Sequence, residues 1–196
     1  MKIAVLNSKG KETGREVTLP KGIFAVEPNE HALYLDVKQY LANQRQGTHK
    51  AKERADITGS TRKIKKQKGT GTARAGSIKS GVFRGGGRIF GPRPRDYDVR
   101  LNKKLKKLAR KSALSLKAKD KAITVVEDFD FKTPKTKKFI DVLKALNIED
   151  KKSLIVFGTP NNNVYLSSRN FKGSEVVTSS EISTYKILNA KQLVIS

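Results

Sequence analysis

The chain has 196 residues, no cysteine and a formal net charge of +24 at pH 7. The absence of cysteine excludes a disulfide framework, a thiolate metal site and cysteine-based catalysis, and it fits a reducing cytosol. No apolar run approaches the ~20 residues that a membrane-spanning helix needs. The apolar run at residues 3–6 is too short for a signal peptide. We therefore expect no membrane partner.

Two strands and one helix are expected before residue 44. Residues 2–6 form an apolar run typical of a strand, and residues 16–19 alternate as a second strand at a sheet edge. Residues 20–28 are predicted to connect this strand to a helix that starts after Asn29, a residue type favoured at the N-cap. The helix should run to about residue 43, since four apolar side chains share one of its faces. These are Leu33, Val37, Tyr40 and Leu41.

The following stretch, residues 44–100, is basic and rich in glycine. Residues 44–112 carry 22 basic and four acidic side chains, whereas the net charge is only +1 for residues 1–43 and +5 for residues 113–196. Residues 57–95 contain no acidic side chain at all. So much charge with so few apolar residues cannot bury enough surface to order the segment by itself. Charge concentrated in one insert is typical of a nucleic-acid interface.

The cations of this stretch, with two lysines just beyond it, are the predicted phosphate-binding residues of an RNA interface. They are Arg45, Lys50, Lys52, Arg54, Arg62, Lys63, Lys65, Lys66, Lys68, Arg74, Lys79, Arg84, Arg88, Arg93, Arg95, Lys103 and Lys104. The glycines of residues 68–76 are expected to let the backbone approach RNA closely. Phe83 and Phe90 are candidates for stacking on unpaired bases. The alternative, that they anchor the base of the loop on the globular part, stays open.

From residue 102 onward, helices alternate with strands. Strands are expected at residues 123–126, 153–157, 175–178 and 192–195. Helices are expected after Asn102, from residue 133 with Pro134 near its first position, over residues 164–168, and from Ser180 to residue 187. Several strands are continuous apolar runs, which favours a parallel sheet covered on both faces.

The predicted fold class is therefore α/β, with a mostly parallel sheet flanked by helices. Residues 1–43 and 101–196 should form one globular domain, and residues 44–100 should form one long, basic, extended loop inserted into it.

Catalytic and metal sites find little support in the sequence. Residues 68–76 are rich in glycine, but they lack the Gly-Lys-Ser/Thr sequence of a P-loop and the spacing of a dinucleotide fingerprint. His31 and His49 are the only histidines, so no metal is expected. Asp96 and Asp98 stand beside arginines, where local salt bridges that close the insert are expected instead of an acid–base pair. We expect no catalytic residue and no cofactor.

A series of short motifs runs through the basic stretch. They are Arg45-Gln46-Gly47-Thr48, residues 54–60, Gln67-Lys68-Gly69-Thr70-Gly71, residues 73–77, Phe83-Arg84-Gly85-Gly86-Gly87, residues 90–95 and Asn102-Lys103-Lys104. In order and spacing, and with the flanking α/β pattern, the chain resembles the bacterial large-subunit ribosomal protein L-four family. It departs from many members at Ile64, Lys65, Thr72, Gly81 and Phe83.

This resemblance implies a structural constituent of the large ribosomal subunit, in the cytoplasm. It implies binding to large-subunit rRNA, help in subunit assembly and contact with neighbouring ribosomal proteins, and no homo-oligomer. The loop would reach the wall of the exit tunnel, where its tip would meet the nascent peptide. Matching the family's motifs to this sequence places the loop tip at Lys66, Gln67, Lys68, Gly69, Thr70, Gly71 and Thr72.

Other functions remain open at this stage. In the family, the tip region also affects access of macrolides, and some members repress their own operon by binding its leader RNA. The sequence decides neither point for this chain. An RNA-modifying or nucleotide-dependent enzyme would need a glycine loop between strand and helix, or a clustered acid–base pair, and neither is found. A free basic RNA chaperone is the third alternative.

Overall fold

The structure is a computed structural model that describes all residues, 1–196. The chain divides into two units. We call Met1–Leu41 with Arg100–Ser196 the sheet unit, and Ala42–Val99 the basic unit. Every strand and every buried hydrophobic side chain belongs to the sheet unit. No helix has the length and apolar character needed to cross a bilayer.

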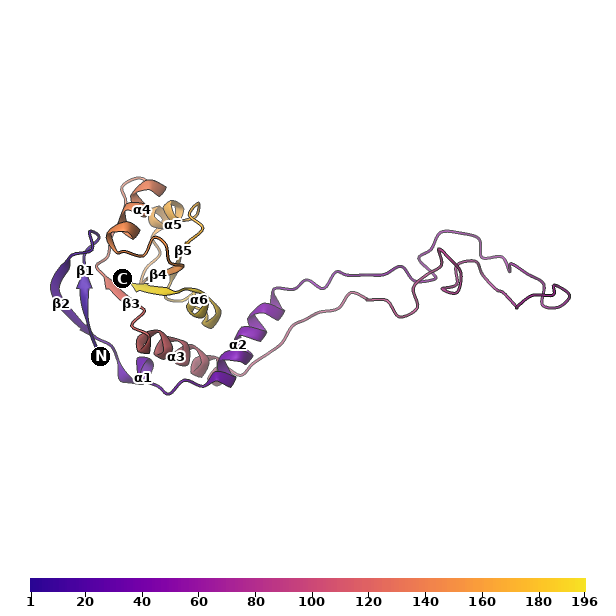
Figure 1. Ribbon diagram of the computed structural model, residues 1–196, viewed down its shortest axis with the longest axis horizontal. Coiled ribbons are helices and arrows are strands. Elements are labelled where there is room, and N and C mark those ends of the chain that lie inside the picture. The colour runs from indigo at the N-terminus through magenta and orange to yellow at the C-terminus, as the bar shows by residue number, and fades with distance from the viewer. The chain divides into compact units, whose positions relative to one another are not determined.

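The sheet unit is built on one six-stranded sheet in the order β2-β1-β3-β6-β4-β5 (Figure 1). The strands are β1 Lys2–Leu6, β2 Glu12–Thr18, β3 Ile123–Val126, β4 Ser153–Phe157, β5 Ser174–Thr178 and β6 Gln192–Ile195. β2 is antiparallel to β1, and every other pair of neighbours is parallel. This confirms the α/β class, the mostly parallel sheet and the place of the second strand at an edge.

Six helices accompany the sheet. They are α1 Lys21–Phe24, α2 Glu30–Asn43, α3 Lys103–Lys119, α4 Thr136–Ala145, α5 Asn162–Ser168 and α6 Thr184–Asn189. The core has two parts, one on each face of the sheet. Leu154 and Val156 of β4 belong to the part that includes residues of α3 and α6. Ile155 and Phe157 belong to the part that includes residues of α4 and α5. Because both faces are covered, β4 reads as a continuous apolar run in the sequence.

Three helix starts differ from the sequence prediction. α5 begins at Asn162 instead of residue 164, because Asn161 caps it and its Oδ1 accepts from the Val164 N–H at 3.1 Å. Ser183, not Ser180, caps α6, and its hydroxyl accepts a bond of 3.2 Å from the Lys186 N–H. α4 begins two residues after Pro134, because Lys135 is extended and donates its N–H at 3.0 Å to Ser167 Oγ in α5. In each case a tertiary or capping bond, which no local pattern reveals, sets the first helical residue.

The N-terminal region matches the prediction in part. Asn29 caps α2 as expected, since its Oδ1 accepts from the Ala32 N–H at 2.8 Å. β2 is longer than predicted because it begins at Glu12 and passes through Gly14, whose φ of +74° favours glycine. The register of β1 against β2 shifts between Ala4 and Leu6, as in a bulge. The predicted connection also contains α1.

Candidate nucleic-acid interface

The basic unit consists of two arms that pair through a few backbone hydrogen bonds. The N–H of Arg95 donates to Gly47 O at 3.2 Å, and that of Ala51 donates to Pro92 O at 3.0 Å. Farther along, Arg88 donates to the carbonyl of Lys52 at 2.8 Å. Between these bonds neither arm forms a strand, and the two run side by side (Figure 1). Isolated bonds of this kind set the register of the arms but leave most of their backbone groups unpaired.

Two glycines allow this pairing. A Cβ added to Gly47 would lie 1.9 Å from Arg95 O, and one added to Gly87 would lie 2.3 Å from Arg54 N. Both distances are far below van der Waals contact, so any larger residue would push the arms apart. A Cβ added to Gly69 or Gly71, in the region predicted as the tip, would have no atom within 4 Å. Gly47 and Gly87 therefore serve the chain's own packing, whereas the role expected above for the glycines of residues 68–76 is contact with RNA.

Tyr97 gathers three basic side chains of the two arms. The guanidinium carbon of Arg45 lies 3.8 Å from the ring centroid, and that of Arg95 lies 4.7 Å from it. The hydroxyl of Tyr97 is 3.5 Å from His49 Nε2. Each such cation–π contact stabilises an exposed site by about 0.5–1 kcal/mol. The ring therefore holds two of the predicted phosphate-binding arginines close together. Tyr97 was not among the predicted site residues, although its place two residues after Arg95 was a usable signal.

A run of turns forms a compact segment at residues 77–87. Three backbone N–H groups each donate a hydrogen bond to the carbonyl oxygen three residues earlier in the chain. These bonds join Ser80 to Ser77, Phe83 to Ser80 and Gly86 to Phe83, at 3.0–3.2 Å. The N–H of Gly87 then closes the segment on Lys79 O at 2.9 Å. The segment is built by local backbone bonds, with no buried hydrophobic side chain.

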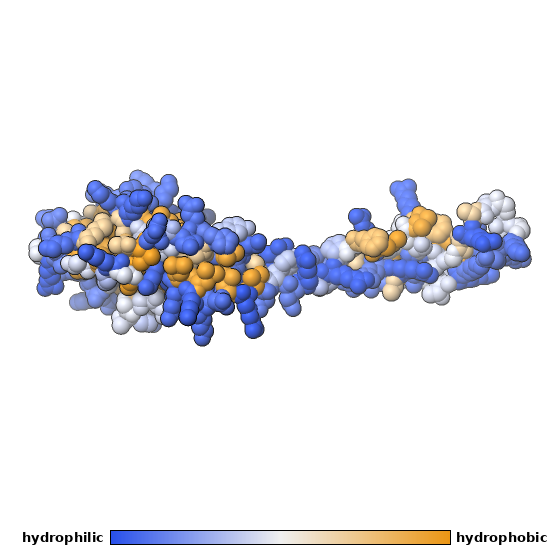
Figure 2. All heavy atoms as spheres, turned by 90° about the horizontal axis from the view of Figure 1, so that it is seen from below, coloured by the Kyte–Doolittle hydropathy of each residue, from blue (hydrophilic) through white to orange (hydrophobic).

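Large apolar side chains near this segment face solvent. Phe90 is 97% exposed and Val82 84% exposed, while Phe83 is 37% exposed. Figure 2 shows hydrophobic atoms gathered part-way along the basic unit, among hydrophilic ones. Phe90 therefore anchors nothing within this chain. Of the two roles left open above, base stacking is the one compatible with its exposure, and it stays a prediction for both phenylalanines.

Two predicted phosphate-binding residues are engaged by acids of the same unit. Lys50 Nζ lies 3.1 Å from Asp56 Oδ2, and Arg93 is paired with Glu53. The partner of Arg93 comes from the opposite arm, and not from its own neighbourhood in the sequence. The hydrogen bond from Lys50 and, next, that from the Glu53 N–H hold the pKa of Asp56 below its usual value.

This lowered pKa makes the Lys50–Asp56 pair dependent on pH in a defined direction. Because the carboxylate form is favoured in the folded arm, the pair is fully formed above the ordinary aspartate pKa, near ~3.9. It should be lost as the pH falls through the lower, folded value. Carboxyl NMR titration of Asp56 measures this, and Lys50→Met should return the pKa toward the ordinary value. An unchanged titration in Lys50→Met would contradict the assignment.

The tip closes between Ile64 and Gly76, where the N–H of Ile64 donates to Gly76 O at 2.8 Å. Lys65 Nζ donates to Thr72 Oγ1 at 2.7 Å across the tip. Lys66, Gln67, Lys68, Gly69, Thr70, Gly71 and Thr72 are all exposed. The predicted tip residues are thus brought together in one small loop, held by the chain's own polar bonds.

Comparison with known proteins shows the family. Residues 17–196 match the ribosomal protein L4/L1 family. The chain belongs to this family. It is 76% identical to the large ribosomal subunit protein uL4 of Christiangramia forsetii, over 99% of this chain and 93% of that protein. The uL4 proteins of Flavobacterium johnsoniae and Bacteroides fragilis are 69% and 60% identical over the whole chain, and over 93% and 94% of their own lengths.

Membership in the ribosomal protein L4/L1 family confirms the resemblance seen in the motifs. The family is one of structural ribosomal proteins, so the chain is not an enzyme, and the enzymatic alternative is excluded. No group of three or more histidine or acidic side chains lies together as a metal site would require.

The predicted RNA-binding residues of this family member are unevenly placed. Fifteen of the seventeen belong to the basic unit, whereas Lys103 and Lys104 start α3 in the sheet unit. Within the basic unit, Lys50 and Arg93 form ion pairs with carboxylates. The two pairs lie outside the predicted tip, whose lysines Lys66 and Lys68 are exposed.

Proposed function

We propose that this chain is a structural constituent of the large ribosomal subunit that binds large-subunit rRNA through its basic unit and assists subunit assembly. The observation that carries the proposal is the composition of that unit. It holds fifteen basic and four acidic side chains and no buried hydrophobic one. A chain segment of this kind gains little from its own packing and much from a surrounding polyanion.

The proposal assigns different roles to the two parts of the chain. Residues 1–43 and 101–196 act as one globular domain, and residues 44–100 act as a loop that penetrates folded rRNA. Lys103 and Lys104 at the start of α3 extend the phosphate-binding surface, because both are exposed. Since the family is ribosomal, the chain works in the cytoplasm, within the ribosome.

The tip, residues 66–72, is proposed to line the nascent-peptide exit tunnel and to contact the peptide and a neighbouring ribosomal protein. Its support is the closed loop between Ile64 and Gly76, which is small, exposed and free of acidic side chains. A loop of that kind can reach a wall of RNA without repulsion and present a short polar surface beyond it. The chain acts there as a single copy.

Washing assembled large subunits in ~1 M salt tests the proposal against the chaperone alternative. Exposed charges are then screened beyond ~3 Å, so a loosely bound cationic chaperone should be removed. An integral component, enclosed by rRNA, should stay with the subunits through sedimentation. A density map of those subunits should then show residues 66–72 at the tunnel wall. Complete loss of the chain in the wash would overturn its place as a constituent.

A further inference from the structure

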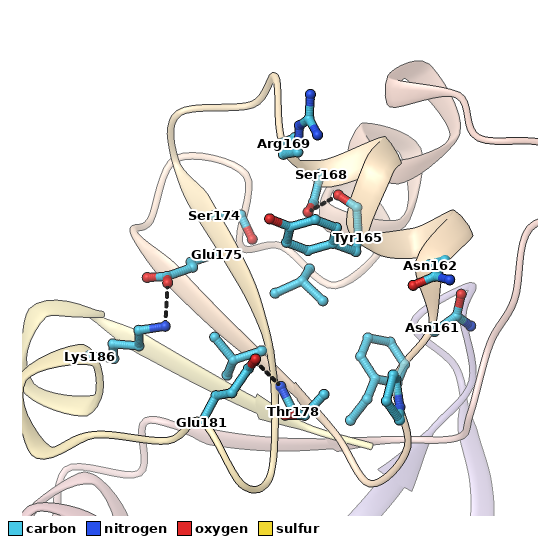
Figure 3. Close-up of a pocket in the computed structure, with 14 residues that line it drawn as sticks. Asn161, Asn162, Tyr165, Ser168, Arg169, Ser174, Glu175, Thr178, Glu181 and Lys186 are labelled. Atoms are coloured by element: carbon cyan, nitrogen blue, oxygen red, sulfur yellow. Dashed lines mark hydrogen bonds and ion pairs between the residues drawn. The ribbon is translucent and has the colours of Figure 1, made fainter.

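A groove of about 610 Å³ runs along the free edge of the sheet at β5. It lies wholly within the sheet unit. Figure 3 shows Tyr165 of α5 and Arg169, which directly follows α5, on one side, and Glu181 and Lys186 on the other. Because β5 is the last strand in the sheet order, its outer edge forms the floor of this groove.

The backbone of β5 offers unpaired hydrogen-bonding groups to the groove. At the two ends of the strand, Gly173 O accepts a bond from β4 and the Ser179 N–H donates one to β4, each at 2.9 Å. Along a parallel strand, the backbone N–H and C=O of alternate residues point toward the same neighbouring strand. Odd-numbered residues of β5 therefore bond to β4, and the N–H and C=O of the even-numbered residues point away from it. These residues are Ser174, Val176 and Thr178.

The chain itself satisfies only one end of this edge. The Thr178 N–H donates to Glu181 Oε2 at 3.2 Å, which closes the edge there. The N–H and C=O of Val176 point into the groove and have no partner strand. Exposed strand edges are normally covered or disrupted, because they attract other chains. Val176 lines the groove although the residue as a whole is only 8% exposed, because it belongs to the core.

The charges around the groove favour a polypeptide over RNA. Two carboxylates, Glu175 and Glu181, and two cations, Arg169 and Lys186, line it, so it is close to neutral in a chain whose formal net charge is +24. Glu175 pairs with Lys186 Nζ at 2.8 Å, while Glu181 holds only a backbone N–H. The groove therefore lacks the excess of positive charge with which the basic unit would attract a phosphate backbone. An extended peptide needs a row of backbone donors and acceptors, and the β5 edge supplies one.

We propose that an extended segment of a neighbouring large-subunit protein adds to β5 as a further strand. Its backbone would pair with the N–H and C=O of Val176, and a basic side chain of the segment would lie near Glu181. The inference rests on the proposed function, since the partner comes from the large subunit.

Hydrogen exchange of the full chain, free and in large subunits, tests the pairing. The Val176 amide should exchange at least ~10-fold more slowly in the subunit, because it gains a hydrogen bond there. The Val177 amide, which faces β4, is the matched control and should be protected in both states. Equal exchange of the Val176 amide in the two states overturns the proposal.

Photocrosslinking identifies the occupant. A benzophenone amino acid in place of Tyr165 should crosslink to one polypeptide segment in the subunit, whereas the same group in place of the exposed Tyr34 on α2 should not reach that segment. A crosslink from position 165 to rRNA, or none, overturns the proposal.

One variant separates this inference from the proposed function. Val176→Pro removes the outward N–H and should still sediment with large subunits, because the basic unit is unaltered, but it should lose the crosslink to the segment. A crosslink that survives in Val176→Pro, with an unchanged melting curve, would overturn backbone pairing at this edge. Failure of the unaltered chain to enter subunits would count against the proposed function instead.

Discussion

Removing residues 59–91 should leave the sheet unit folded while lowering the affinity for large-subunit rRNA by about 1000-fold or more at ~0.1 M salt. The deletion takes out nine basic side chains and no buried hydrophobic one. Far-UV circular dichroism and thermal melting measure the fold, and filter binding over a range of salt measures the affinity. The slope of log affinity against log salt concentration should become shallower by several units, because each lost phosphate contact reduces its magnitude by about 0.7–0.9.

The control for this deletion is a variant with a glycine–serine linker of equal length in place of residues 59–91. It keeps the chain length and should behave like the deletion, which assigns the loss to the basic side chains. Loss of cooperative unfolding in either variant would show that the sheet unit depends on the loop. Affinity that is unchanged at ~0.1 M salt would remove the basic unit from the RNA interface.

Phe139→Ala should lower the free energy of unfolding by about 3–5 kcal/mol, because it empties a fully enclosed site in the core. Phe139 of α4 is 0% exposed, and its ring packs edge-on against Phe171 with centroids 6.4 Å apart. For a chain of this size the melting temperature should fall by roughly 10 °C. Urea unfolding followed by circular dichroism measures the change.

The matched control is Phe90→Ala, the same chemical change at a side chain that is 97% exposed. It should change the free energy of unfolding by less than about 0.5 kcal/mol. If Phe90 stacks on a base, rRNA affinity should fall by a factor that corresponds to about 1–3 kcal/mol. An equal loss of stability in the two variants would contradict the division between core and interface, and unchanged affinity in Phe90→Ala would remove its stacking role.

The strands were the most predictable elements, for a physical reason that β4 illustrates. A strand buried on both faces needs apolar side chains at every position, so Ser153–Phe157 appears in the sequence with its true bounds. Helix starts were less predictable, as at α6, because capping depends on which hydroxyl can reach a free N–H. Ser180 and Ser183 are equivalent residue types, and only the fold selects Ser183.

The candidate interface was predictable in its charges but not in its geometry. The cations of the basic unit follow from composition alone, since a run without acids needs no tertiary information to be found. Their partners do not: Arg93 pairs with Glu53 from 40 residues away, and Arg45 and Arg95 meet on Tyr97. These contacts depend on the register of the two arms, which Gly47 permits by its close approach to Arg95.

The amino-acid sequence alone determined the α/β class, the family motifs and the concentration of positive charge, because hydrophobic runs and charge are properties of consecutive residues. Only the tertiary structure decided the strand order, the two-sided core and the groove along β5. Each of these depends on which distant segments lie next to each other, and the free energy of that packing is not contained in any local stretch of the chain. The same reason explains why the unpaired backbone of Val176 could be recognised only after β5 was found at the edge of the sheet.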